Sequence, residues 1–183
     1  MKEILERLLR NAKDDPSLQG RDLTYTEKGI PVLWDLPFYG NKEEVEAAIS
    51  FLEREEVLAA LRKGLLLPET QVFIWVSQDG ELDYGLVQGD YFITLWVPSV
   101  WEKVKNLPLA QQKIVAAEEV YRLAHEKFHR ERAWKEETLR DLINPWTPLT
   151  KEERKERLEY LLQNLHPSWK NLRDKVEVLL TVA

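Results

Sequence analysis

QVFIWVSQDGELDYGLVQGDYFITLWV, residues 71–97, consists of three apolar runs separated by two short turn sequences. Asp79-Gly80 predicts a two-residue hairpin, because both central positions of such a turn favour positive φ. Gln88-Gly89-Asp90 marks the second turn. The stretch therefore predicts a three-stranded antiparallel β-meander. Its first and third runs are almost wholly apolar, so we expect helices to cover both faces of this sheet.

Helical patterns flank the meander on both sides. Apolar residues recur at helical spacing in residues 2–12, 42–63, 108–142, 150–165 and 168–181. Three residue pairs have the spacing of an N-cap and a glutamate: Asn41 with Glu44, Ser99 with Glu102, and Thr150 with Glu153. Prolines and glycines in residues 16–40 predict an extended arm, in which residues 23–26 and 32–34 are compatible with short strands. The predicted fold class is α+β, with the meander packed against several helices and a helical C-terminal half.

The length of 183 residues and the absence of a flexible linker predict a single domain over residues 1–183. We expect it to contain an N-terminal helix and turn-rich arm (1–40), an α/β core (41–142) and C-terminal helices (149–181). Hydrophobic residues make up 44% of the chain and charged residues 32%, which are the proportions of a folded globular protein. No apolar run reaches 18 residues, so we expect no membrane span and no membrane partner.

The chain contains no cysteine and one methionine. A disulfide framework and a thiolate ligand or nucleophile are therefore excluded, and we expect a cytoplasmic protein or a component of an assembly built inside the cell. The charged helices fit a heat-adapted source and a mesophilic one equally. The sequence has no phosphate-binding glycine loop, no dinucleotide-binding fingerprint and no serine-hydrolase elbow.

Charge is distributed unevenly along the chain. Residues 1–90 carry 18 acidic and 10 basic side chains, whereas residues 91–183 carry 14 acidic and 16 basic side chains. Salt bridges between surface helices explain this asymmetry, and so does a surface that faces a partner or a second copy of the chain.

The sequence HEKFH contains the sharpest chemical motif of the chain, formed by His125, Glu126 and His129. On a helix, residues four apart point within about 40° of each other, so both imidazoles can share one metal ion. Glu126 can then take a proton from a water molecule that zinc has acidified. The spacing therefore predicts a zinc site in which Glu126 is the catalytic base.

The order of the elements around this motif resembles that of the small zincin-type metallopeptidases, in which a helix and a three-stranded antiparallel sheet precede the motif helix. The resemblance covers about residues 42–165. It implies that His125 and His129 are zinc ligands, that Glu126 is the base, and that the sheet edge aligns a peptide substrate. A later helix would supply the third ligand, for which the candidates are Glu152, Glu153, Glu156, Glu159 and His166.

Other residues in the same helix favour a solvated surface instead. Lys127 and Arg130 place positive charge beside the motif, and a nearby cation disfavours a divalent metal. The apolar stripe of the helix passes beside the histidines and leaves Glu126 toward solvent; its members are Ile114, Ala117, Tyr121, Ala124 and Phe128. In this interpretation Glu126 forms ion pairs along the helix with Arg122 and Arg130.

Tryptophan is abundant, with seven residues in the chain. Trp75 and Trp96 fall in the predicted strands. We expect exposed aromatic anchors for a protein partner in the arm and in the C-terminal half, since tryptophan concentrates at interface hot spots; these are Trp34, Phe38, Tyr39, Trp134 and Trp146. A nucleic-acid surface would combine the aromatics with the basic residues Arg130, Arg132, Lys135 and Arg140, but the interleaved glutamates Glu131, Glu136 and Glu137 cancel most of this charge.

Three functions therefore follow from the sequence. The leading prediction is a non-catalytic protein without a cofactor that binds other protein chains or itself, as an assembly component or homo-oligomer. The alternative is a zinc-dependent peptidase that uses His125, Glu126 and His129. The third is an accessory factor for single-stranded nucleic acid.

Overall fold

The computed structural model describes residues 1–98 and 100–182, so the N-cap predicted at Ser99 lies outside the described residues. The helices span α1 (Lys2–Asn11), α2 (Lys42–Leu52), α3 (Glu55–Gly64), α4 (Val100–Val104), α5 (Leu109–Ile143), α6 (Lys151–Gln163) and α7 (Lys170–Val182), and a 3-10 turn, η1, covers Ala12–Asp14. The strands span β1 (Gly20–Tyr25), β2 (Pro31–Leu36), β3 (Gln71–Val76), β4 (Leu82–Gln88) and β5 (Tyr91–Trp96). This composition confirms the α+β class and the helical C-terminal half.

The sheet has five strands in the order β1-β2-β3-β4-β5, which corrects the predicted three-stranded sheet. Strands β3, β4 and β5 form the antiparallel meander, and β1 and β2 form an antiparallel hairpin. The hairpin joins the meander through parallel pairing of β2 with β3, with Val32 opposite Ile74. Parallel neighbours need a crossover connection, which α2 and α3 provide. The arm is therefore part of the sheet.

The first turn of the meander differs from the predicted two-residue hairpin. The backbone N–H of Ser77 donates to the carbonyl of Glu81 at 2.9 Å, and that of Gly80 donates to the carbonyl of Ser77 at 3.0 Å. Within this turn only Gly80 has positive φ, at 85°, so the turn needs a single left-handed residue. A three-residue loop that ends in a left-handed glycine satisfies the strand twist in the same way.

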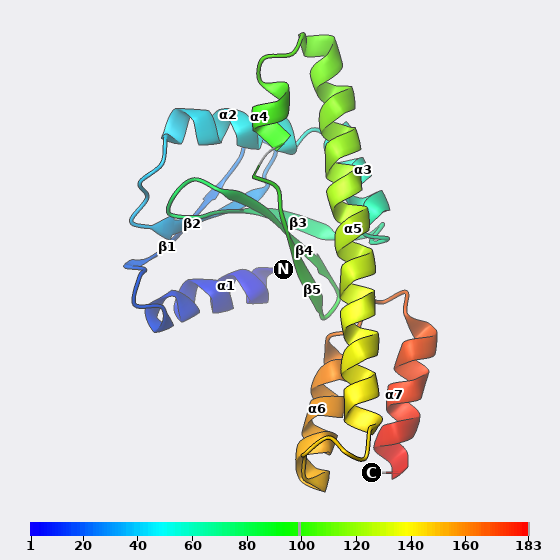
Figure 1. The fold of residues 1–183 in the computed structure, drawn as a ribbon. Coiled ribbons are helices and arrows are strands. Elements are labelled where there is room, and N and C mark those ends of the chain that lie inside the picture. Colours follow the sequence, from blue (N-terminus) through cyan, green and yellow to red (C-terminus); the bar gives the residue numbers. More distant parts are fainter. Residues whose placement is uncertain (99, 183) are drawn as a thin grey trace.

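Helices cover the two faces of the sheet unequally. We call the face under α2, α3, α4 and α5 the upper face and the face over α1 the lower face, as they appear in Figure 1. In β3, Ile74 and its alternate neighbours enter the upper core, whereas Phe73 and Trp75 pack toward α1. Both faces of β3 are thus covered, as predicted. In β5 the lower face is only partly covered, and 56% of Trp96 is exposed.

The predicted helix over residues 42–63 is divided into α2 and α3. Both caps that can be tested are confirmed: Asn41 Oδ1 accepts from the backbone N–H of Glu44, and Thr150 Oγ1 accepts from that of Glu153, each at 3.1 Å. At the end of α3, a Cβ on Gly64 would lie 2.6 Å from the Cβ of Ala124. Glycine therefore allows α3 and α5 to cross in close contact.

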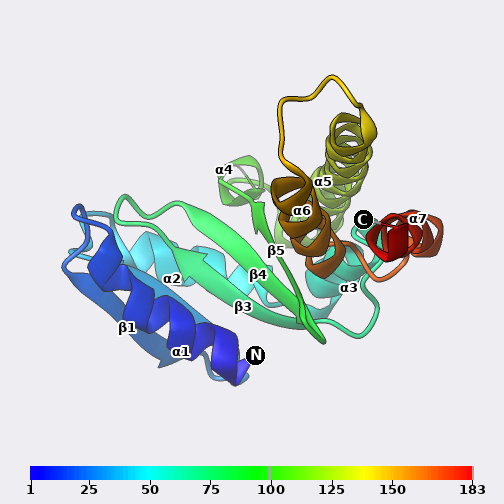
Figure 2. The same cartoon turned by 90° about the horizontal axis from the view of Figure 1, so that it is seen from below.

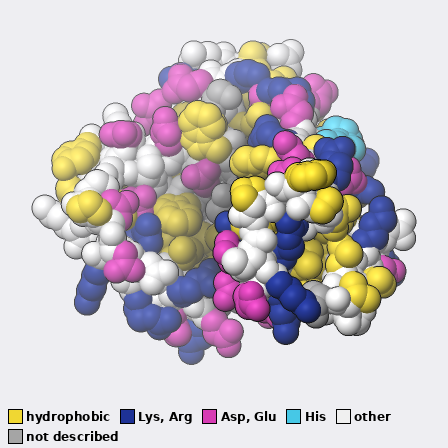
Figure 3. All heavy atoms as spheres, turned by 60° about the horizontal axis from the view of Figure 1, so that its bottom comes forward, with side chains coloured by type: hydrophobic (Ala, Val, Ile, Leu, Met, Phe, Trp, Pro, Cys, Tyr) yellow, Lys and Arg dark blue, Asp and Glu magenta, His cyan; other side chains and the backbone are white. Residues whose placement is uncertain are grey.

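Helix α5 is 35 residues long and continues well beyond the sheet, where α6 and α7 pack around it (Figure 1, Figure 2). Buried side chains from all three helices join the upper core, among them Leu139, Leu158, Leu161, Leu172 and Val176. Figure 3 shows hydrophobic side chains in the hollow between the sheet and these helices. Within the described residues, none of the helices is both long enough and apolar enough to cross a membrane.

The ring of Phe73 packs directly against the backbone of Gly85. The Phe73 ring covers Gly85 on the neighbouring strand, and a Cβ on Gly85 would lie 2.2 Å from its Cζ atom. Phe73 is fully buried and stacks on Phe92, with ring centroids 6.0 Å apart. The ring can occupy this position only because residue 85 has no side chain.

We expect Gly85→Ala to lower the free energy of unfolding by about 3 kcal/mol, because the added methyl group overpacks the lower face. Urea denaturation monitored by tryptophan fluorescence measures this change. Phe73→Leu in the Gly85→Ala background should recover part of the loss, since the smaller side chain vacates the space. A loss below about 0.5 kcal/mol for Gly85→Ala would contradict the contact.

Candidate functional site

The three motif residues His125, Glu126 and His129 lie near the middle of α5, on its solvent-exposed side. Ala124, just before the motif, and Phe128, within it, are buried in the upper core. His125, Glu126 and His129 are all exposed, and Figure 3 shows histidine side chains at the molecular surface beside basic ones. The imidazole rings of His125 and His129 are adjacent, with centroids 4.4 Å apart. The structure therefore brings the two predicted ligands together.

Glu126 is engaged with an arginine rather than directed at the histidines. Its Oε1 accepts from Nη1 of Arg122 at 3.0 Å, in the (i, i+4) ion pair that the surface interpretation predicts. Arg122 also contacts Glu119, and this contact together with Lys103 lowers the pKa of the Glu119 carboxyl. To serve as a base for a metal-bound water, Glu126 would have to leave this network.

His166, a candidate third ligand, belongs to the core instead. Its side chain is 1% exposed, and Nε2 lies 2.7 Å from the carbonyl oxygen of Leu65. Nδ1 accepts from the backbone N–H of Ser168 at 3.0 Å. The Phe128 ring contacts both His129 and His166, with centroid distances of 5.4 and 5.0 Å. Both nitrogens of His166 are thus occupied on the inner side of Phe128.

The remaining third-ligand candidates, Glu152, Glu153, Glu156 and Glu159, lie on α6 and are exposed. Over residues 1–98 and 100–182, no group of three or more His, Cys, Asp or Glu side chains is arranged to hold a metal ion. The described side chains therefore offer two adjacent ligands of the predicted zinc site without a third.

The predicted aromatic anchors differ in exposure. Trp34 is 8% exposed, which corrects the expectation that it is free for a partner: its indole Nε1 donates to Thr24 Oγ1 at 2.8 Å, and its ring meets Phe38 edge-on at 5.4 Å. Phe38 is partly buried. Tyr39, Trp134 and Trp146 are exposed by 72%, 63% and 89%.

Hydrogen bonds hold the loop that presents Trp146, between α5 and α6. The guanidinium of Arg154 donates to the carbonyls of Leu142 and Thr147, both at 2.6 Å. The Thr147 hydroxyl donates to the carbonyl of Asp141 at 2.7 Å, and the backbone N–H of Trp146 donates to Asn144 Oδ1 at 3.0 Å. The loop is therefore fixed in a conformation that leaves the indole in solvent. The role of Arg154 could not be predicted from the sequence, because its hydrogen-bond partners are backbone carbonyls and backbone atoms form no sequence motif.

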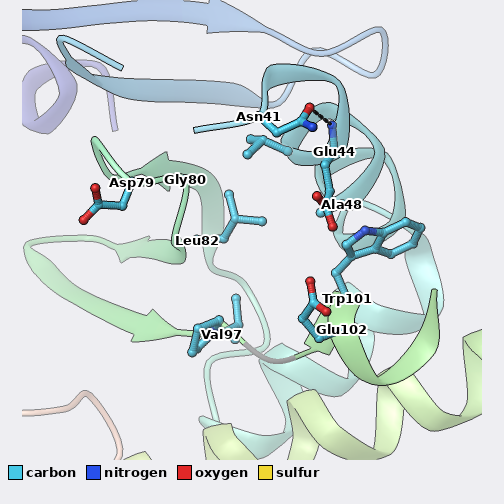
Figure 4. A pocket seen from close by; sticks show the side chains of 11 residues that line it. Asn41, Glu44, Ala48, Asp79, Gly80, Leu82, Val97, Trp101 and Glu102 are labelled. Carbon is cyan, nitrogen blue, oxygen red and sulfur yellow. Dashed lines mark hydrogen bonds between the residues drawn. The ribbon is translucent and has the colours of Figure 1, made fainter. Parts of the chain in front are cut away.

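A cavity of about 200 Å³ lies between α2, α4 and the β3–β4 turn (Figure 4). Figure 4 shows the carboxylates of Glu44 and Glu102 approaching from α2 and α4, with Leu82 and Val97 at the floor. Lys105 bridges these carboxylates at 3.3 and 2.8 Å, so one of their two charges is compensated. The indole N–H of Trp101, which also lines the cavity, has no hydrogen-bond partner among the described residues.

Two basic side chains on α5 are paired with the glutamates four residues after them. Lys127 contacts Glu131 and Arg132 contacts Glu136, both at 3.1 Å. These pairs reduce the positive field that a phosphate backbone would need.

His166 should make stability depend on pH. Burial lowers the pKa of its imidazole below the usual 6.5, so the unfolded chain binds a proton that the folded chain resists. The stabilisation is present above pH 6.5 and is lost as pH falls through the lower folded-state pKa. When the pH is lowered from 7 to 5, we expect the midpoint temperature of unfolding to decrease more in the wild type than in His166→Gln. His129→Gln, at an exposed position, should retain the wild-type dependence; equal slopes for wild type and His166→Gln would contradict this role.

Comparison with known protein families, with curated proteins and with solved structures finds no match to this chain. The basis for a functional assignment is therefore the chemistry of the side chains described above. Two features distinguish them: a histidine pair without a third ligand, and tryptophans that are held in solvent.

Proposed function

We propose that this chain is a non-catalytic protein that binds other protein chains, with Trp146 as the principal anchor and Trp134 as a second one. The observation that carries the proposal is the combination of an indole that is 89% exposed with a loop that is fixed by hydrogen bonds. Burying a tryptophan side chain removes a large apolar area from water and stabilises a complex strongly. A loop that is already ordered loses little conformational entropy on binding.

The distribution of charge supports a second copy of the chain as one such partner. The first 90 residues carry a net charge of −8 and the remaining residues one of +2. In the fold, the acidic part contains α1–α3 and most of the sheet, and the basic part contains the long helices. Parts of opposite net charge on two copies attract each other, and added salt weakens this attraction.

The peptidase remains a separate candidate because the rings of His125 and His129 are adjacent. Metal analysis of protein purified without chelator distinguishes the two proposals. We expect no stoichiometric zinc and no loss of stability in His129→Ala, because the imidazole is exposed. Zinc near one equivalent that His129→Ala removes would favour the peptidase.

We expect Trp146→Ala to weaken partner binding or self-association at least tenfold, since it removes the anchor, while the thermal midpoint stays the same. Light scattering after gel filtration at several salt concentrations measures self-association, and pull-down from the source organism measures other partners. Arg154→Ala should weaken binding as well, because it frees the loop. Trp96→Ala, which removes an exposed tryptophan from β5, is the matched control and should bind like the wild type. A salt-independent monomer that captures no partner would overturn the proposal.

A further inference from the structure

Strand β1 forms one edge of the sheet, and its outer side is uncovered. β2 is its neighbour on one side, and no strand of the described chain follows β1 on the other. Figures 1 and 2 show β1 at the outer margin of the molecule, with α2 above this end of the sheet and α1 below. An uncovered edge strand is a template for another strand.

The backbone of β1 directs alternate residues outward. Thr26 donates its N–H to the carbonyl of Ile30 at 2.9 Å, and the register continues with Thr24 opposite Val32 and Asp22 opposite Trp34. In an antiparallel pair, hydrogen-bonded residues alternate with residues whose N–H and C=O point away. Arg21, Leu23 and Tyr25 therefore present these groups to the outside. Asp22 Oδ1 accepts the N–H of Leu23 at 2.9 Å, so among the described residues the outward N–H groups of β1 that remain for a partner are those of Arg21 and Tyr25.

A cavity of about 570 Å³ lies beside this edge on the lower face. It extends between α1 and β1, where Leu5 and Leu9 of the helix face Leu23 and Tyr25 of the strand. Lys2 and Glu6 contribute opposite charges to its rim. Because apolar side chains such as these leucines form most of its lining, the cavity is mainly apolar.

A second cavity, of about 300 Å³, lies beside the same edge on the upper face. Trp34 and Phe38 form its aromatic floor, and Tyr25 borders both cavities. Lys42 places its Nζ 6.0 Å from the Trp34 ring centroid, whereas Asp22 and Glu46 are acidic. Two carboxylates against one ammonium group leave the rim negative, and aromatic rings attract cations.

We propose that β1 accepts an extended segment of a partner protein as a sixth strand, with apolar side chains in the lower cavity and basic side chains, at alternate positions, in the upper cavity. Successive side chains of a strand point to opposite faces, so one segment reaches both cavities. Main-chain hydrogen bonds to Arg21 and Tyr25 supply affinity, and the cavities supply specificity. This inference extends the proposed protein-binding function to a surface that does not include Trp146.

A second copy of the chain fits this edge less well. Antiparallel pairing of two β1 strands about Leu23 would place Asp22 and Thr24 of the copy on the upper face. The carboxylate of the copy would then approach Asp22 and Glu46, and like charges repel. A basic side chain has the opposite charge, which is the reason for assigning a basic segment.

The test uses three end-capped, fluorescein-labelled peptides of nine residues. One alternates valine and lysine, the second has glutamate in place of lysine, and the third is the lysine peptide with N-methylated valines, which keeps its charge but cannot donate ladder hydrogen bonds. Fluorescence anisotropy with the full chain measures affinity. We expect the lysine peptide to bind at least tenfold more tightly than either of the others. Equal affinity of the N-methylated peptide, or no binding at about 1 mM, would overturn the proposal.

Two pairs of variants locate the binding on the protein. Tyr25→Pro removes an outward N–H without breaking the ladder to β2, so it should lower the affinity for the lysine peptide at least tenfold. Tyr25→Thr retains the N–H and should not lower this affinity tenfold. Glu46→Lys should shift the preference toward the glutamate peptide; Glu43→Lys, on the same helix but outside the cavity, should not. Unchanged binding by Tyr25→Pro, or a dimer that Tyr25→Pro converts to monomer, would contradict the assignment. A negative result with these peptides would not affect the test of partner binding by Trp146→Ala, so the two proposals are tested separately.

Discussion

The rest of the fold depends on the burial of strand β3 on both of its faces. Every residue of this strand after Gln71 is apolar, and the side chains alternate between the upper core and the lower core. Neither face can be left in water without losing a large hydrophobic contribution. Helix α1 therefore packs below and α2–α5 above, and the β1–β2 hairpin fills the open side of β3 that the meander leaves unpaired.

Helix α5 extends this constraint to the residues of the HEKFH motif. Its inner positions, including Ala124 and Phe128, are buried against α3 and the C-terminal helices, and the contact between Gly64 and Ala124 fixes its rotation. With these positions inward, His125 and His129 lie on the flank of the helix, about 80–120° from the buried direction, and Glu126 lies on the opposite side, because successive residues are about 100° apart. The helical spacing of the motif is correct for a metal, while the packing of the helix directs its residues to solvent.

The two proposed binding surfaces lie far apart in the fold (Figure 1). The Trp146 loop connects the ends of α5 and α6, whereas β1 borders the sheet at its other end. They use different physical chemistry: a fixed apolar anchor at the loop, and backbone hydrogen bonds with flanking cavities at the strand. A protein with both surfaces can contact two chains at once, which suits an assembly component.

Local sequence patterns were enough to predict the meander strands, the helical segments apart from the break between α2 and α3, the two caps, and the exposure of Trp134 and Trp146. Each depends on residues close together in the chain, whose hydrogen bonds and periodicity are local. Three features could be seen only in the folded chain: the parallel pairing of β2 with β3, the burial of Trp34, and the contact of His166 with Leu65 instead of with His129. These outcomes follow from contacts between segments that are distant in sequence, where burial of apolar surface selects among pairings that local patterns leave equivalent.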